Sequence, residues 1–368
     1  MLDFPEANRR TMADYSQYQG PNPEWEEFVR VTEIPPVGLA PGETPADLRR
    51  SRNALRETAS KIELEASGLL EKVSWQDAAI PTRDNSTVPA RIYRPKGVDL
   101  STTGPLPVYL FFHGGGYLFG SLDTEDANCA RVVAMSPTPV IVVHVNYRHT
   151  PDFRYPTQHD DAWDAFLWLG ENIASLGGDR GKVIVGGISA GGGLTAAVVL
   201  QAQDRSDSAA HLRIVGQLLL IPWILHPKAY PFHLLASKER SSFLQNADAP
   251  ILPHTQIDMF LDVFDGPDTD PTDILLNPPL APDEKIKGMP KSVVVAAGMD
   301  PLRDEALLYA DKLKKNGVPT QVYVFPGLPH GFRRFDTLKA SARWDEVIVE
   351  GIQWCLSDNV ENSTKVEL

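Results

Sequence analysis

The chain has 368 residues, of which 42% are hydrophobic, and it carries a formal net charge of −13. A chain of this size and composition is long enough for one large hydrophobic core and a smaller accessory part. The excess of acidic residues argues against binding to nucleic acids or anionic membranes, because both present negative charge. The two cysteines, Cys129 and Cys355, fit neither a metal-binding spacing nor a disulfide framework, and we expect no metal and no other cofactor.

The two ends of the chain bear on where the protein works. The first residues, MLDFPE, lack the basic and apolar regions of a secretion signal, and no apolar run reaches the length of a membrane span. The final KVEL resembles a retention signal of the endoplasmic reticulum, but that address is not read without an entry signal. We therefore expect a cytoplasmic protein with no membrane partner, and the sequence leaves open whether it forms a homodimer.

The hydrophobic pattern predicts the order of helices and strands. Residues 1–40 show little periodicity, a helix is expected at 46–62, and two strands at 74–80 and 88–93 form a hairpin-like pair. Strands and helices then alternate, which is typical of a mainly parallel sheet with helices on both faces, and the chain is therefore assigned to the α/β class. The further strands are expected at 106–112, 140–146, 182–188, 214–221, 292–297 and 321–325, and the helices at 160–176, 191–203, 305–316 and 337–356.

A long segment interrupts this alternation between the strands ending at 221 and beginning at 292. A simple crossover needs about a dozen residues, and this segment is far longer and rich in aromatic residues. We expect residues 223–290 to form a cap insertion that, together with an N-terminal cap segment at 1–72, covers a core made of 73–222 and 291–368. Tyr117, Trp223 and Phe243 are the candidate substrate-binding side chains; the alternative is that such aromatics only form the cap's own small core.

The motif HGGGY at 113–117 follows the strand predicted at 106–112. Consecutive glycines allow backbone N–H groups to approach a ligand without interference from side chains. Gly114 and Gly115 are therefore candidate donors to a carbonyl oxygen under attack, as in an oxyanion hole. A phosphate-binding loop is the competing interpretation, but the spacing is not G-x-G-x-x-G and no helix clearly follows.

The motif GISAG at 187–191 lies between an apolar strand and a helix-compatible stretch. This context is typical of a nucleophile elbow, a sharp turn that exposes its serine at a helix N-terminus. Ser189 is the candidate nucleophile, and the N–H of Ala190 is a third candidate oxyanion donor. Taken alone, the motif would also fit a glycine-rich turn with a helix-capping serine.

Asp300 and His330 each follow a later predicted strand, so they lie at the same sheet edge as Ser189. A histidine there can take the serine proton, and an aspartate can orient the histidine. Each residue also fits a plainer interpretation: Asp300 as the cap of the following helix, and His330 as a loop residue without a role. Asp304 and Glu305 are nearby rivals for the acid, although we expect both inside the helix.

These motifs together resemble the hormone-sensitive lipase family of α/β-hydrolases. The matching segments are HGGGY (113–117), VNYR (145–148), YPTQHDDAWDAFLWL (155–169), GISAGG (187–192), DPLRDE (300–305) and PHGF (329–332). The resemblance implies a mostly parallel eight-stranded sheet with a cap, and independently assigns the triad to Ser189, Asp300 and His330. Ile188 and Gly193 depart from the family pattern, which usually has Asp or Thr before the nucleophile.

The function expected from these residues is hydrolysis of a small or medium-sized carboxylic ester through an acyl-enzyme. The same triad would also serve an acyltransferase, an amidase or a biosynthetic tailoring enzyme, because exclusion of water depends on the pocket. A receptor without catalysis is a third interpretation, but such relatives usually lack a triad residue.

Overall fold

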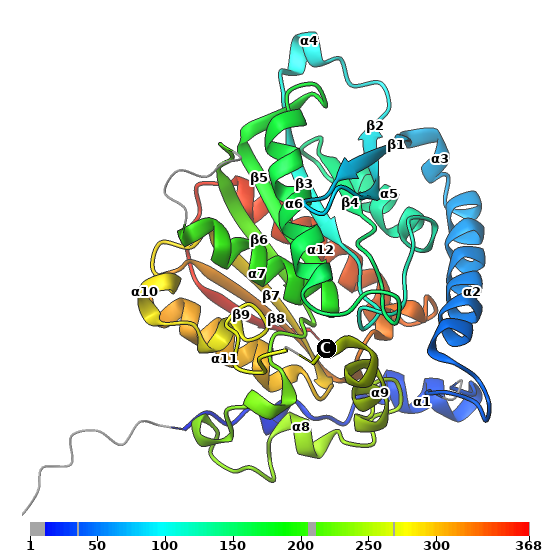
Figure 1. Ribbon diagram of the computed structural model, residues 1–368, viewed down its shortest axis with the longest axis vertical. Helices are drawn as coiled ribbons and strands as arrows, with labels where there is room; N and C mark the ends of the chain where they lie inside the picture. Colours follow the sequence, from blue (N-terminus) through cyan, green and yellow to red (C-terminus); the bar gives the residue numbers. More distant parts are fainter. Residues whose placement is uncertain (1–11, 35–36, 205–210, 268, 368) are drawn as a thin grey trace, which may run out of the picture.

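A nine-stranded sheet forms the centre of the computed structural model, which describes residues 12–34, 37–204, 211–267 and 269–367 (Figure 1). The strand order is β1-β2-β4-β3-β5-β6-β7-β8-β9; β2 is antiparallel to both its neighbours, and the other pairs are parallel. The α/β prediction and all eight predicted strands are confirmed. The strands are β1 (Val73–Pro81), β2 (Thr87–Pro95), β3 (Leu106–Phe112), β4 (Ile141–Val145), β5 (Gly178–Ile188), β6 (Ile214–Leu220), β7 (Lys291–Met299), β8 (Thr320–Pro329) and β9 (Ser363–Val366).

The expected count of eight strands is wrong by one, because β9 adds a parallel edge strand beside β8. This strand has four residues, of which three are exposed, so it lacks the apolar alternation that reveals a strand in sequence. The central strands are easier to recognise, because both of their faces are covered. In β3 every residue is buried, which explains its continuous apolar run.

Helices cover both faces of the sheet (Figure 1). Helices α5 and α12 pack with one core cluster, whereas α6, α7 and α11 pack against the opposite face. The five predicted helices are present as α2, α6, α7, α11 and α12, and among the described residues the longer helices α1, α5 and α9 and the four-residue helices α3, α4, α8 and α10 were not predicted. The helices are α1 (Pro23–Val31), α2 (Pro45–Ala66), α3 (Leu69–Lys72), α4 (Leu100–Thr103), α5 (Asp126–Met135), α6 (Thr157–Asn172), α7 (Ala190–Asp204), α8 (Ser242–Gln245), α9 (His254–Phe264), α10 (Asp283–Ile286), α11 (Arg303–Lys315) and α12 (Lys339–Leu356).

The N-terminal segment contacts two different parts of the molecule. Ala13 forms a β-bridge with Leu235, and the Gln19 amide donates to the Asn246 side chain, so the first described residues join the insertion. Helix α2 instead packs against α5, where Ser60 Oγ accepts a hydrogen bond from the Ala127 amide. In Figure 1, α1, α8 and α9 lie together at the bottom, and α2 runs up one side of the core.

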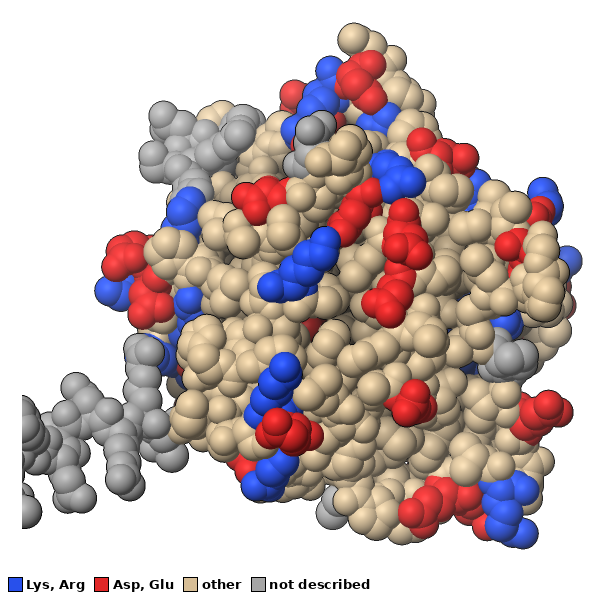
Figure 2. Space-filling model, turned by 60° about the horizontal axis from the view of Figure 1, so that its bottom comes forward, with Lys and Arg blue, Asp and Glu red and all other residues tan. Residues whose placement is uncertain are grey.

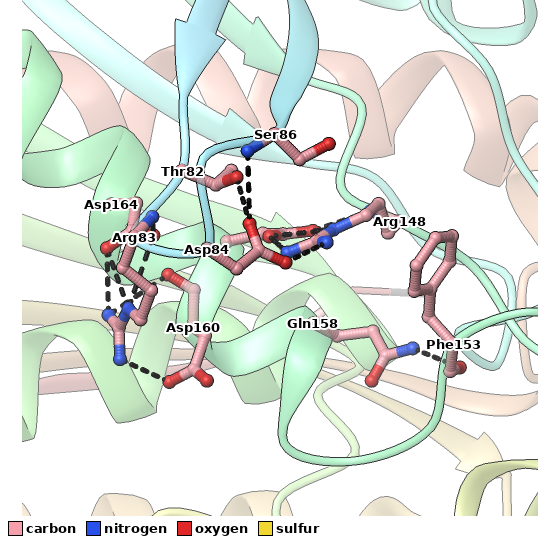
Figure 3. A network of polar contacts seen from close by, with 10 residues as sticks. Thr82, Arg83, Asp84, Ser86, Arg148, Phe153, Gln158, Asp160 and Asp164 are labelled. Carbon is pink, nitrogen blue, oxygen red and sulfur yellow. Dashed lines mark hydrogen bonds and ion pairs between the residues drawn. The ribbon is translucent and has the colours of Figure 1, made fainter.

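A network of ion pairs fastens the β1–β2 turn to α6 (Figure 3). Arg148, which follows β4, bonds to the fully buried Asp161 of α6 and to Asp84 of the turn. Arg83 of the same turn reaches Asp164 and Asp160, one turn of helix apart. These contacts fix the loop that leaves β4 beside the glycine loop after β3.

Four histidines surround this loop: His113, His144 and His159 are buried, and His149 is half-buried. The His113 ring stacks on Tyr147, 4.5 Å between centroids, and meets His144 edge-on. Burial lowers the pKa of all four side chains, and lowers the pKa of His159 to about 4. They are therefore neutral in the folded protein at pH 7.

Lowering the pH from 7 to 5 should reduce the melting temperature. The unfolded histidines take up protons below about pH 6.5, whereas the depressed folded pKa values keep these four neutral. The stability they contribute is thus present above pH 6.5 and is lost as the pH falls toward the folded values, by about 1.4 kcal/mol per histidine and pH unit. Calorimetry at several pH values measures this slope.

His144→Phe is the matched control, because both of its ring nitrogens lack a hydrogen-bond partner and phenylalanine keeps a ring in the same space. In this variant, the slope of the free energy of unfolding against pH should correspond to about one proton fewer taken up on unfolding. An unchanged slope would show that His144 does not titrate between the two states.

Candidate active site

Ser189 stands in a strained turn between β5 and α7. Its φ of 55° lies in the left-handed region, which non-glycine residues rarely adopt. The turn is fixed from both sides: the Ser189 amide donates to the Leu220 carbonyl at 2.9 Å, and its carbonyl accepts from the Gly193 and Trp223 amides. This is the geometry of a nucleophile elbow, and the local strain is retained because surrounding contacts determine the backbone.

The elbow packs directly against the end of β3. Phe112 is paired with Gly187 in the sheet, and a Cβ atom on Gly191 would collide with the Phe112 carbonyl oxygen. Glycine is therefore required at 191 for a close approach of two backbones. The consequence is that the glycine loop after β3 begins beside Ser189.

The three predicted triad residues meet as expected. His330 Nε2 lies 2.9 Å from Ser189 Oγ, and His330 Nδ1 lies 2.7 Å from Asp300 Oδ2. Ser189 and His330 are each 7% exposed, and Asp300 is fully buried. These distances allow a proton to pass from the serine to the imidazole while the carboxylate orients the ring.

Asp300 does not cap the following helix, because α11 has Leu302 at its N-cap position and no side-chain capping bond. Its Oδ2 faces His330, and its Oδ1 accepts the amide of Leu302 at 2.9 Å in the turn that leads into α11. This contact within the turn holds one carboxylate oxygen while the other faces the histidine, so the turn itself orients the carboxylate.

The two rival acids point elsewhere. Asp304 is buried, pairs with Arg303, and accepts the Ser242 amide at 2.7 Å. Glu305 Oε1 accepts the amides of Ile224 and Leu225, and burial raises the pKa of its carboxyl well above the usual value. Both lie within α11, as predicted, and neither bonds to His330.

The glycine loop after β3 has a backbone conformation that favours glycine. Gly115 and Gly116 have φ values of 133° and 61°, and a Cβ on Gly115 would collide with the Phe119 carbonyl. Tyr147 Oη donates to the His113 carbonyl at 2.8 Å, which fixes the start of the loop. Among the described residues, the amides of Gly114 and Gly115 have no main-chain partner. Ala190, the third expected donor, is the first residue of α7.

The three candidate substrate-binding residues do not form one group. Tyr117 stacks on Phe264 with centroids 4.3 Å apart, and its ring lies 5.8 Å from that of Trp223. Both line a small cavity of about 20 Å³ under α9. Phe243 instead packs against His254 and Tyr230, within the segment between β6 and β7.

The departure at Gly193 has a structural reason. A Cβ there would collide with the Trp223 carbonyl and lie 2.9 Å from Tyr117 Oη. A larger residue at 193 would thus displace the two aromatic residues beside the elbow. Ile188, the other departure, packs with the core cluster on the α5 and α12 face.

Arg303 and Phe264 are site-flanking residues that sequence reasoning did not single out. Arg303 lies inside the DPLRDE motif, so its position was visible, but its buried contacts were not. Among the described residues, no group of three or more potential ligands has the geometry of a metal site. In the same part of the chain, no helix combines the length and apolar character needed to cross a bilayer.

Known proteins share this fold and sequence pattern. The α/β hydrolase fold family matches residues 109–334. Carboxylesterase NlhH of Mycobacterium tuberculosis (strain CDC 1551 / Oshkosh) is 36% identical over 269 residues, which is 73% of this chain and 78% of the relative. Ethyl acetate hydrolase of Pseudomonas putida is 31% identical over 337 residues, or 90% of this chain and 98% of the relative.

A solved structure, vibralactone cyclase, matches with a TM-score of 0.80 and 27% identity over 92% of this chain and 95% of that chain. The sheet order, the elbow and the similarity to esterases agree with one another. The chain therefore belongs to the α/β hydrolase fold family, among the carboxylesterase-type serine hydrolases of the hormone-sensitive lipase kind.

Proposed function

We propose that this protein hydrolyses small to medium-sized carboxylic esters through an acyl-enzyme on Ser189. The observation that supports this assignment most directly is the continuous chain of contacts from Ser189 Oγ through His330 to Asp300. A serine hydroxyl alone is a poor nucleophile at neutral pH, and a positioned base removes that difficulty.

The reaction then has two halves. His330 takes the proton as Ser189 Oγ attacks the ester carbonyl, and returns it to the alcohol that leaves. Water activated by the same histidine next attacks the acyl-enzyme and releases the acid. Asp300 keeps the imidazole oriented and stabilises its charged form in both halves.

The oxyanion of each tetrahedral intermediate needs donors that are in place beforehand. The amides of Gly114, Gly115 and Ala190 are the candidates, because the glycine loop begins beside the elbow. Donors that do not have to reorganise stabilise the transition state most effectively, and each is worth about 3 kcal/mol.

The size of the substrate is inferred from the surroundings of the elbow. Trp223, whose amide donates to the Ser189 carbonyl, lies with Tyr117 and Phe264 under α9, so aromatic side chains crowd the space beside the elbow. The name of the Pseudomonas putida relative indicates ethyl acetate as that protein's substrate, which agrees with a short acyl group. The face seen in Figure 2 shows charged side chains in small groups on a largely uncharged surface.

The proposal extends to the segments and side chains around the elbow. Residues 223–290, together with the N-terminal segment, are proposed as the cap, and Tyr117, Trp223 and Phe243 as substrate contacts. Acyl transfer, amide cleavage and tailoring chemistry would use the same triad, and the name of vibralactone cyclase makes ring closure worth testing. A cytoplasmic location and a homodimer also remain proposals.

Ser189→Ala should keep the fold and lower kcat by about 10³-fold or more, because only binding and the oxyanion donors remain. Alanine fits the elbow sterically, so circular dichroism should match the wild type. Steady-state kinetics on a chromogenic acetate ester measures the loss. A serine-directed phosphonate should label Ser189 in the wild type, and wild-type activity in the folded variant would disprove the nucleophile assignment.

Asp300→Asn should lower kcat by about 10⁴-fold, because a loss of this size follows when an amide replaces the acid of such a triad. Glu305→Gln is the matched control, because the amide oxygen of glutamine can still accept the Ile224 and Leu225 amides. Burial raises the pKa of the Glu305 carboxyl, which favours its neutral form, so the neutral amide is a close replacement. We expect this variant to keep kcat within a few-fold. The reverse ranking would move the acid from 300 to 305.

A series of esters with increasing acyl length should give a kcat/KM that rises and then falls. Each methylene adds about 0.8 kcal/mol of binding while the pocket has room, and added carbons clash or stay in water afterwards. The maximum is expected at about two to eight acyl carbons, a length that suits a pocket of ordinary size. Matched amides, lactones and acyl acceptors in the same assay separate hydrolysis from the alternatives.

Long-chain triglyceride as the best substrate would contradict the small-ester proposal. Labelling of Ser189 by phosphonate without cleavage of any simple ester would instead favour a tailoring enzyme.

A further inference from the structure

Arg303 is the largest side chain in the described chain that is fully buried, and it lies three residues after the proposed catalytic acid. Its Nε donates to Asp304 Oδ1 at 2.7 Å, and its Nη1 donates to the Gly298 carbonyl at 3.0 Å. Gly298, near the end of β7, stands before Asp300 in the chain, and Asp304, in α11, stands after Asp300. The guanidinium therefore joins the two sides of the turn that carries Asp300.

The remaining contacts of this guanidinium reach two distant segments. Nη1 also donates to Gln19 Oε1 at 3.0 Å, and Nη2 donates to Gln245 Oε1 of α8 at 3.1 Å. Gln19 in turn donates to Asn246, the residue after α8. The N-terminal segment and the insertion are thus joined to each other and to the turn through one side chain.

Ser242 of α8 strengthens the same junction. Its Oγ donates to the Pro301 carbonyl at 2.9 Å and accepts the Asp304 amide, while its own amide donates to Asp304 Oδ2. The part of the turn between Asp300 and α11 is therefore bonded directly to the insertion.

The N-terminal residues 18–22, which we call the N-terminal brace, also pack on the strand ends that lead to the acid and the base. A Cβ on Gly298 of β7 would collide with the Tyr18 carbonyl, and one on Gly20 would lie 3.0 Å from Gly327 Cα of β8. Asn22 Nδ2 donates to the Pro326 carbonyl at 3.0 Å. The brace thus spans the end of β7, which leads to Asp300, and the end of β8, which leads to His330.

A buried guanidinium is costly unless its N–H groups are paired, and removing one partner leaves the cost uncompensated. Four of its five N–H groups have acceptors here, supplied by three separate parts of the chain. The planar arrangement of donors cannot be reproduced by lysine, which is a compact point charge. The position of the turn therefore depends on the docking of both segments.

We propose that Arg303 is a positioning residue, through which the docked N-terminal brace and α8 determine the distance between Asp300 and His330. This inference rests on the proposed role of Asp300. It assigns the N-terminal segment a part in aligning the triad, in addition to any part in enclosing the substrate.

The test compares Arg303→Lys and Gln19→Met in the full chain with Arg91→Lys as the structural control. Arg91 is a largely buried arginine of β2, paired with Asp77, Asp123 and Asp126 away from the proposed triad. Gln19→Met keeps the side-chain volume, removes one acceptor from the guanidinium, and leaves Arg303 itself intact.

Arg303→Lys should lower kcat by about tenfold to a hundredfold with KM within about twofold, since a misplacement of about 1 Å is enough for such a loss. Gln19→Met should show the same pattern with a smaller loss. In both, the acid limb of the pH profile of kcat/KM should move to lower pH, because a weaker bond to Asp300 stabilises protonated His330 less. Arg91→Lys should lower the melting temperature and leave kcat and the pH profile unchanged.

The proposal is wrong if Arg303→Lys and Gln19→Met, folded by circular dichroism at the assay temperature, keep the kcat and pH profile of the wild type. An equal loss of kcat in Arg91→Lys would also overturn it, since the effect would then follow stability alone. If Arg303→Lys does not fold, Gln19→Met decides the question. Full activity in Asp300→Asn would instead refute the proposed function on which this inference rests.

Discussion

The structure of the site depends on a contact between two backbones. The elbow after β5 and the end of β3 approach so closely that any side chain at Gly191 would meet the Phe112 carbonyl. This approach places the serine and the glycine loop side by side without an intervening side chain. A polar reaction centre needs donors that are already in position, and two adjacent strand ends supply them with little conformational freedom.

The proposed catalytic acid and base reach the same sheet edge by a different route. Parallel strands all end at that edge, so β7 and β8 bring Asp300 and His330 to the elbow through topology. Topology alone leaves the turns after the strands undetermined by an ångström or more. The insertion and the N-terminal segment contact these turns, and the contacts through Arg303 and Ser242 are buried and well paired.

The positions of the three triad candidates could be predicted from sequence, because the patterns that reveal them are local. Ser189, Asp300 and His330 each stand a few residues beyond an apolar run, in an order and context that local patterns reveal. Arg303 was visible in the DPLRDE motif, but its partner Gln19 is 284 residues away, and no local pattern reports such a contact. Helix α9 was missed in a segment expected to form a cap, and the short, polar β9 has no periodic signal. The aromatic pattern likewise grouped Phe243 with Tyr117 and Trp223, although the Phe243 ring packs against His254 and Tyr230.

Strand β9 also has a consequence for how two copies of this chain can associate. A sheet is commonly extended across subunits by pairing of its outermost strands, whose free N–H and C=O groups invite a partner. In this chain β9 occupies the outer side of β8, and the outermost strands are β1 and β9. Since β9 is only four residues long and mostly exposed, it offers a short and polar template. A dimer built by joining two sheets through β8 would first have to displace the C-terminal segment of each copy.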